Sequence, residues 1–578
     1  MFILMNDGYK SSEWENEMVR QPDVQFHVPT RTRKAMKMPS RTPWLQPIWF
    51  FCAGILFLGL GFSLLWLEQT PAAARDAIDL SDADYIGASE CSSCHRDLAR
   101  RHDDSRHGLA LIDTSRDKDP ILADFSVGAE LRQVQFPGED APRAFEADDI
   151  AYVIGSGRYS QRYLYEVDRG DNRVLPAEWD VAAGAWRPLS LANSWDDPAY
   201  DWETNCAYCH TTGLNLENGR WEDDGVQCES CHGPGEIHEE LASDAGRNPD
   251  EEELVNIRAA INPATDPQVC GQCHSRGATA EGQPFPVGFR PGSDLSAAFT
   301  LSTTDQTDHW WSSGHASQAN MQFNEWSASA HASSLNSLRE SEQAEDSCLR
   351  CHSSDYAYTQ RLIAAVESED RGGQAPAPAT LDSAQFGVGC ISCHNPHSQA
   401  AFDFNLVQEP ATLCADCHTN TPEGIHHPSK EMFEGVDFVE GISGFVGAHF
   451  GAEDGPTCAS CHLPSVPISS GGERSSHTFA PVLAFDVEGL PDSCSSCHED
   501  QASPENISAL IAAIQTDTQA RLETARAAVT DATPAWVTQA LDFVEGDGSL
   551  GVHNYTYADA LLDAVYEELG LYTTEAGQ

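Results

Sequence analysis

The stretch GVQCESCHGPGEIHEE, residues 225–240, decides how the rest of this chain is interpreted. Two cysteines stand three positions apart, a histidine follows the second one directly, and another histidine comes six residues later. This set of side chains suits a structural zinc ion, a redox-active dithiol or the covalent attachment of haem. A single copy leaves these alternatives open, so the other cysteines of the chain must distinguish between them.

The same pattern recurs along the chain. Of the 19 cysteines, all except Cys52 belong to nine copies of Cys-x-x-Cys-His. The cysteines of the nine motifs are Cys91, Cys94, Cys206, Cys209, Cys228, Cys231, Cys270, Cys273, Cys348, Cys351, Cys390, Cys393, Cys414, Cys417, Cys458, Cys461, Cys494 and Cys497. The histidines of the nine motifs are His95, His210, His232, His274, His352, His394, His418, His462 and His498.

Only one of the alternatives explains every element of this repeat. Structural zinc needs four ligands per ion in a different spacing, and disulfides do not explain a histidine in all nine copies. In haem c, two thiols add to the vinyl groups and the next histidine binds the iron from the proximal side. Positions i, i+3 and i+4 share one face of a helical turn, so one turn presents all three groups. We therefore predict nine covalently bound haem c groups.

Charge excludes one class of partner. The 578 residues include 89 acidic and 34 basic side chains, which gives a formal net charge of −55. Such a field repels nucleic acids, so we expect no nucleic-acid partner.

Near the N-terminus, residues 48–67 form a run of 20 residues without a charged side chain, long enough to span a bilayer as a helix. Basic residues precede this run and acidic residues follow it, which predicts a cytoplasmic tail over residues 1–47 and a periplasmic remainder. We favour an uncleaved signal-anchor, with a linker over 68–84, in a single-pass inner-membrane protein. The alternative is a cleaved signal peptide, which would leave a periplasmic or secreted protein.

The density of motifs predicts the architecture. Eight motifs lie within residues 206–498, roughly one per 40 residues, too few for a separate side-chain core around each. We therefore expect a mainly α fold with sparse regular structure, in which residues 85–500 wrap around stacked haems. A β-rich insertion of hairpins is predicted at about 110–200, where aromatic and β-branched residues alternate with GDN and AAG turns. Apolar residues at helical spacing predict that residues 501–578 form a C-terminal helical segment.

Several segments resemble a known family. They are SECSSCHRDLARRHDDSRHGLA (89–110), WSASAHASSLN (326–336), GVGCISCHNPH (387–397), HHPSKEMFEG (426–435), GPTCASCHLP (455–464), SSHTFAP (475–481) and GVHNYTYADALLDAVYEEL (551–569). Together with the opening stretch, they look like multihaem cytochromes related to the tetrahaem cytochrome of ammonia oxidisers. That group is similar to pentahaem nitrite reductase and octahaem hydroxylamine oxidoreductase, and the likeness covers roughly residues 85–570.

Twelve histidines lie outside the motifs and after the apolar run. Each could be a surface imidazole, but nine irons need sixth ligands, and methionine is too scarce there to supply them generally. The resemblance implies that His107, His238, His331, His397 and His553 are distal ligands. A weaker likeness adds His315, His427, His449 and His477, and it leaves His102, His309 and His426 as spares. The choice between His426 and His427 stays open.

The chain departs from the family at one informative position. Pentahaem nitrite reductases replace one motif histidine by lysine at the catalytic haem, whereas no motif of this chain ends in lysine. Because nine candidate distal ligands match nine irons, we favour an electron conduit of bis-histidine haems over an enzyme, with quinol-oxidising or periplasmic cytochromes as redox partners. The alternative is an oxidoreductase that acts on a small nitrogen or sulfur compound at one open haem, with His309 or His426 as proton donor. A haem filament is a third possibility.

Overall fold

The computed structural model describes residues 78–572. The gaps within this range are residues 79, 81, 116, 169, 370–374, 398–401, 422–423, 440–441, 453–454, 484–488 and 499–503. The chain divides into two compact units, Met1–Ala73 and Ala74–Gln578, and all described residues belong to the second. The predicted apolar span, residues 48–67, lies outside the described part. Within that part, no helix is both long enough and apolar enough to cross a bilayer.

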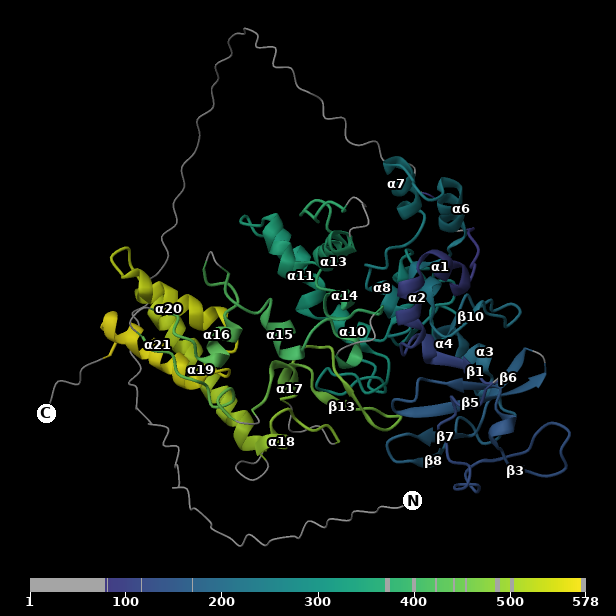
Figure 1. Ribbon diagram of the computed structural model, residues 1–578. Helices are drawn as coiled ribbons and strands as arrows, with labels where there is room; N and C mark the ends of the chain where they lie inside the picture. The colour runs from purple at the N-terminus through teal and green to yellow at the C-terminus, as the bar shows by residue number, and fades with distance from the viewer. Residues whose placement is uncertain are drawn as a thin grey trace, which may run out of the picture. The chain divides into compact units, whose positions relative to one another are not determined.

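Short helices carry the haem-attachment motifs (Figure 1). They are α1 (Ala88–Cys94), α4 (Ala207–His210), α5 (Cys228–His232), α8 (Gln268–Gly271), α12 (Leu349–His352), α14 (Cys390–Cys393), α15 (Pro410–Ala415), α17 (Cys458–His462) and α18 (Ser495–His498). At His95, His274, His394, His418 and His498, the backbone N–H donates to the carbonyl of the motif's first cysteine at 2.9 to 3.2 Å. One helical turn therefore presents both cysteines and the histidine of a motif on one side.

The remaining helices connect or cover these turns. They are α2 (Arg96–Asp103), α3 (Trp202–Asn205), α6 (Glu236–Ala245), α7 (Glu251–Ala259), α9 (Leu295–Ala298), α10 (Gln322–Ser327), α11 (Ala330–Arg339), α13 (Ser354–Glu369), α16 (Ser429–Glu434), α19 (Pro504–Ala528), α20 (Ala535–Gly546) and α21 (Tyr555–Glu568). Short 3₁₀ turns occur at Gly108–Ala110, Ala147–Asp149, Pro198–Tyr200, Asp346–Cys348 and Asp403–Asn405.

The stretch predicted to form hairpins contains an antiparallel sheet of six strands. They are β1 (Leu111–Asp113), β4 (Tyr152–Ile154), β5 (Ser160–Asp168), β6 (Asp171–Val174), β7 (Ala177–Asp180) and β8 (Ala185–Pro188). Their order is β1-β4-β5-β7-β8, and β6 also pairs with β5. Gly170 of the GDN sequence lies between β5 and β6, and the AAG sequence lies between β7 and β8.

Four strand pairs are described elsewhere in the second unit. They are β2 (Gln133–Val134) with β3 (Arg143–Ala144), β9 (Thr211–Thr212) with β10 (Asp223–Asp224), β11 (Gly277–Ala278) with β12 (Thr300–Leu301), and β13 (Ser465–Pro467) with β14 (Glu473–Ser475). The fold thus mixes short helices with small sheets, and the prediction of a mainly α fold was too strong. The sheets were underestimated because two-residue strands carry no alternating pattern to detect.

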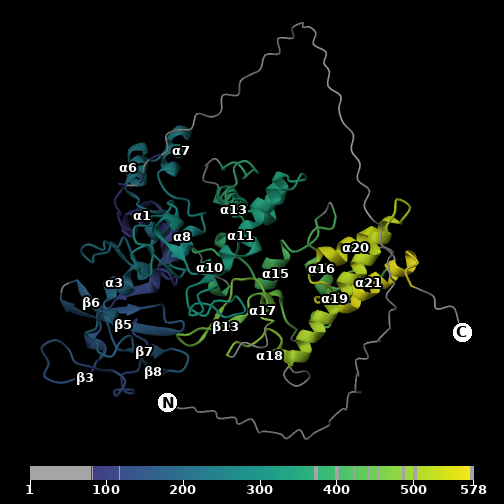
Figure 2. The same cartoon turned by 180° about the vertical axis from the view of Figure 1, so that it is seen from behind.

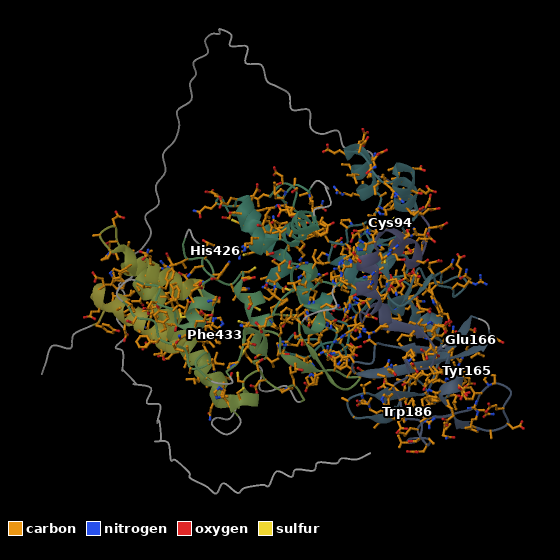
Figure 3. All side chains as sticks on the ribbon, in the orientation of Figure 1. Cys94, Tyr165, Glu166, Trp186, His426 and Phe433 are labelled. Atoms are coloured by element: carbon orange, nitrogen blue, oxygen red, sulfur yellow. The ribbon has the colours of Figure 1, made fainter. Side chains whose placement is uncertain are left out.

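Aromatic side chains form the core beside the large sheet. Trp179 and Trp186 are register partners in β7 and β8, and their ring centroids lie 5.5 Å apart. Trp186 is labelled in Figure 3. Phe145 and Tyr163 are fully buried against Trp186. Such rings bury a large apolar area, so this sheet has a side-chain core of its own and does not depend on haem.

The C-terminal helices form a second independent core. Helices α19, α20 and α21 pack against one another in the yellow-green part of the ribbon, as seen from both sides (Figures 1 and 2). Their facing residues include the fully buried Leu541 and Leu561. The Asn554 side chain caps α21 by accepting the backbone N–H of Tyr557, and this cap directly follows His553. The bundle therefore fixes the position of one candidate ligand.

Truncating this core tests its contribution to stability. Leu541→Ala removes a side chain with 0% exposure, so we expect the free energy of unfolding of the bundle to fall by about 2–5 kcal/mol. Leu510→Ala on α19, where the side chain is 51% exposed, is the matched control and should cost well under about 1 kcal/mol. Thermal unfolding followed by far-ultraviolet circular dichroism measures both, and equal losses would contradict the assignment of this core.

Candidate functional site

Most motif histidines lie opposite a second histidine ring. In the described part of the chain, eight of the nine do so. The ring centroids are 6.3 Å apart for His95 and His238, 6.2 Å for His274 and His107, 5.8 Å for His232 and His397, 6.0 Å for His418 and His331, 6.1 Å for His352 and His426, 6.4 Å for His394 and His477, 6.1 Å for His462 and His553, and 6.2 Å for His498 and His449.

This spacing fits one iron between two imidazoles. An imidazole nitrogen binds a transition metal at about 2 Å, so two rings on opposite sides of one ion have centroids about 6 Å apart. Direct packing of two aromatic rings permits closer approach, as between His426 and His427 at 4.2 Å. The described residues therefore fit haem iron held by histidine from both sides, next to the thiols of the same motif.

Backbone carbonyls orient the motif histidines. The Nδ1 atoms of His210, His232, His394 and His462 lie 2.7 to 3.1 Å from a carbonyl oxygen. A ring that donates from Nδ1 keeps its proton there, which leaves the lone pair of Nε2 for a metal. The fold thus selects the tautomer that can bind iron.

Burial also keeps the opposing rings neutral. It lowers the pKa of His107, His331, His397, His427 and His477 to about 4 in each case. Below that pH the ring would be protonated and could not bind a metal, whereas at pH 7 its lone pair is available.

His553 differs from this group. Burial alone would lower the pKa of its ring, but the Asp547 carboxylate, 2.6 Å from Nδ1, offsets that effect and raises the pKa. A carboxylate at Nδ1 orients a ligand histidine and increases its basicity.

The opening stretch shows how one segment serves two motifs. His232 lies on α5, and the chain turns at Gly233, where φ is +76°. Helix α6 then places His238 opposite His95 of the first motif, with its Nδ1 bonded to the carbonyl of Ile257 at 2.8 Å. The second histidine of this stretch therefore meets a neighbouring motif.

A buried carboxylate holds the first motif against the third. Glu229, the second residue of CESCH, is 1% exposed. It accepts the backbone N–H groups of Ile86, Gly87 and Gly235 at 2.7 to 3.1 Å. Burial raises its pKa, although these donors lower it. Nothing in the motif spacing distinguishes this glutamate from the variable residues of the other motifs.

Glu325 plays a similar part beside His477. It is 3% exposed, and it accepts the backbone N–H of His477 at 2.6 Å and that of Ala316 at 2.9 Å. Glu325 lies on α10, far from His477 in the sequence, and no sequence pattern predicts this contact.

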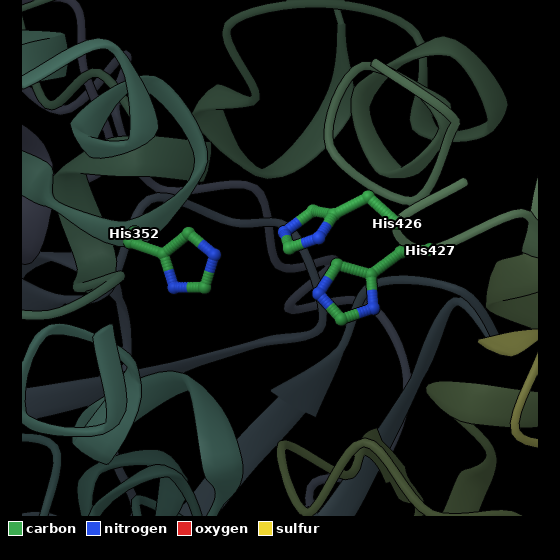
Figure 4. A group of neighbouring side chains, drawn as sticks. All are labelled: His352, His426 and His427. Carbon is green, nitrogen blue, oxygen red and sulfur yellow. The ribbon is translucent and has the colours of Figure 1, made fainter. Parts of the chain in front are cut away.

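Two adjacent histidines compete for one position. His426 and His427 both face His352, at 6.1 and 6.3 Å, and the ligand atoms of all three lie within 4.8 Å of one another (Figure 4). His427 also lies 6.3 Å from His418, which already faces His331. Both rings thus have ligand spacing to His352, and the geometry keeps the choice between them open.

The structure does not support His315 as a ligand. This ring is 2% exposed, and its nitrogens lie 3.0 Å from the Ser313 hydroxyl and 3.1 Å from the Ala480 carbonyl. Because both nitrogens have partners, neither is directed at a motif. The three expected spares have other contacts: His102 bonds to the Val226 carbonyl, His309 bonds to the Ser302 hydroxyl, and His426 faces His352.

One motif histidine has a different neighbour. The ring of His210 lies 5.8 Å from that of Trp202, and no described histidine forms a ring contact with it. The sequence analysis found nine candidate distal ligands for nine irons because it included His315. No local sequence pattern reveals the contacts that His315 makes in the fold.

Contacts between thiols connect the motifs. Electrostatic interactions between thiols join five cysteine pairs: Cys91 and Cys228, Cys209 and Cys273, Cys270 and Cys390, Cys351 and Cys417, and Cys414 and Cys458. Weaker charge interactions connect Cys231 with Cys270, Cys393 with Cys414, and Cys461 with Cys494.

These contacts form a line of seven motifs in the order 91–95, 228–232, 270–274, 390–394, 414–418, 458–462 and 494–498. The motif 206–210 branches from 270–274, and the motif 348–352 branches from 414–418.

Comparison with known proteins agrees with this geometry. The family described as doubled CXXCH motif matches residues 384–423, and that described as cytochrome c554 and c-prime matches residues 190–233. No curated protein sequence matches the chain. The structure described as outer cell wall cytochrome OcwA is similar over 84% of this chain and 99% of its own, with a TM-score of 0.67 and 28% identity.

A second solved structure shares the fold at lower identity. The undecaheme cytochrome from the S-layer of Carboxydothermus ferrireducens is similar over 86% of this chain and 70% of its own, with a TM-score of 0.52 and 20% identity. Repeated Cys-x-x-Cys-His turns, histidines opposite them and these structural relatives lead to one conclusion: the chain is a multihaem c-type cytochrome.

Proposed function

We propose that this chain binds nine haem c groups and conducts electrons along them between redox proteins outside the cytoplasm. The observation that carries the proposal is the set of eight histidine pairs at 5.8 to 6.4 Å. When bound, haem supplies an iron that alternates between two oxidation states. An iron with histidine on both sides has no position left for a substrate, which favours electron transfer over catalysis.

The chain's own residues provide a rigid frame for this transfer. Glu229 and Glu325 hold segments that carry ligands, and backbone carbonyls fix the motif rings. The thiol contacts bring neighbouring motifs together, so the haem edges bonded to those thiols would also be close. Electron transfer depends steeply on edge separation, and this frame needs no moving part to keep it short.

Location and partners belong to the same proposal. The two structural relatives are described as cytochromes of an outer cell wall and of an S-layer. The charge-free run at residues 48–67, with a basic flank, supports a haem domain outside the cytoplasmic membrane. We propose quinol-oxidising or periplasmic cytochromes as partners, attachment to the inner membrane through this run, and no nucleic-acid partner.

The haem count follows directly from the motifs. A pyridine haemochrome assay on the mature protein, normalised to protein by amino-acid analysis, should give nine haems c per chain, one for each motif. A value of seven or fewer haems per chain in fully matured protein would contradict the predicted count of nine.

Removing one opposing histidine tests the ligand pairs. His238→Ala should convert one haem from low-spin to high-spin and add one carbon monoxide site in the reduced protein, because His95 would lose its opposing ring. His315→Gln is the control, since both nitrogens of His315 have other partners, and it should leave the spectrum unchanged. Electron paramagnetic resonance and carbon monoxide titration measure both variants. A fully low-spin His238→Ala protein would overturn the assignment.

One observation favours a second candidate function. In the described part of the chain, no histidine ring faces His210, so a haem at residues 206–210 would lack a histidine on its distal side. We propose as the alternative that a small nitrogen or sulfur compound reacts at this haem. The expected proton donors, His309 and His426, contact Ser302 and His352 instead, so neither is assigned to this site.

Carbon monoxide titration distinguishes the two functions. The reduced wild-type protein should bind one equivalent per chain, because ferrous haem binds this ligand only where a position is open. His210→Met should perturb that site alone, while His232→Met, at a paired motif, should leave it intact. No binding at all would rule out the enzymatic alternative and leave the conduit.

A further inference from the structure

Two histidines that are adjacent in the sequence converge on one motif. His426 and His427 lie between Gly424 and α16, and their ring centroids are 4.2 Å apart. Successive side chains of an extended chain point in opposite directions, but here the backbone bends at His426 and brings the two rings together. Figure 4 shows both rings on the same side of His352, and their centroids lie 6.1 and 6.3 Å from it. This stretch therefore offers two imidazoles to one motif.

The ends of the stretch are anchored in the fold. Ile425 packs against the buried core of the C-terminal bundle, and Pro428 is itself buried. His426 bonds through its backbone N–H to the Asn420 side chain at 3.3 Å, but among the described residues neither of the two rings forms a hydrogen bond. The backbone is therefore held in place, while each ring can turn toward the motif or away from it.

An iron bound to His352 can accept only one of the two rings. The ligand atoms of all three histidines lie within 4.8 Å of one another. Two nitrogens on opposite sides of one iron are about 4 Å apart, because each binds at about 2 Å, so a small shift brings either ring to bonding distance. The four porphyrin nitrogens and His352 leave a single position on the iron. One of the two rings is therefore idle whenever the other is bound.

We propose that His426 and His427 are interchangeable distal ligands of the haem at residues 348–352, which therefore exists in two ligation states. In the exchange, the Fe–N bond to one imidazole breaks and the bond to the other forms, with no net transfer of a proton or an electron. His426 is exposed, so water and small ligands can approach this site. The second ring, 4.2 Å from the first, closes the iron again when its neighbour leaves. This inference rests on the proposed conduit and adds how one of its haems keeps a sixth ligand.

Single and double variants of the holoprotein test the exchange. His426→Ala and His427→Ala should each stay as low-spin as the wild type and bind no additional carbon monoxide, because the remaining ring takes the position. The double variant should convert one haem to high-spin and bind one more carbon monoxide per chain. Added imidazole should restore its low-spin signal, which a misfolded site would not allow. His449→Ala is the matched control, because it removes the ring that faces His498 and should open a site by itself.

Electron paramagnetic resonance compares the two ligation states in the oxidised wild-type protein. The ring planes of His426 and His427 make angles of 53° and 40° with that of His352, and the g-values of low-spin ferric haem depend on this angle. Each single variant should therefore show one low-spin signal for this haem, and the wild type should show both. A wild-type spectrum identical to that of one single variant would overturn the exchange.

The titrations can contradict the proposal in two further ways. An open site in either single variant would show that one ring is the sole ligand, as would be the case for His427 if it served His418 instead. A double variant that matches the wild type would show that neither ring binds iron. Failure of the conduit would look different, because the pyridine haemochrome assay would then give too few haems in the wild-type protein itself.

Discussion

The structure depends on pairs of histidines that face each other across about 6 Å. Such a pair can bind one iron only if both rings are neutral and each directs a nitrogen at the iron. The two rings must also come from elements on opposite sides of the iron. Burial, carbonyls at Nδ1 and the carboxylate of Asp547 meet these conditions ring by ring. Glu229 and Glu325 then hold the backbone that carries the rings. Much of the irregular chain can thus be understood as support for these pairs, while the large sheet and the C-terminal bundle have cores of their own.

Local patterns could be predicted and long-range partners could not. The motif turns, the helix over Pro504–Ala528 and the hairpin turns follow from spacing within a few residues, and the structure has them at those places. The ring opposite each motif comes from a segment about 50 to 170 residues away, for which the sequence offered only a family likeness. That likeness selected His315, whose two ring nitrogens have other partners in the fold, and it left His426 and His427 undecided. Short strands and buried glutamates were missed because two or three residues carry no periodic signal.

The order in which the two rings of each pair occur in the sequence has a consequence for biogenesis. A chain synthesised from its N-terminus presents His95 well before His238, and His462 well before His553. Five of the eight motifs that have an opposing ring meet one that emerges later, so irons attached early would wait in a half-ligated, reactive state for the distant segment. The final helix would arrive last and complete a site nearly a hundred residues upstream. Maturation would then proceed in a fixed order, and a prematurely terminated chain would carry covalent haem with unprotected iron.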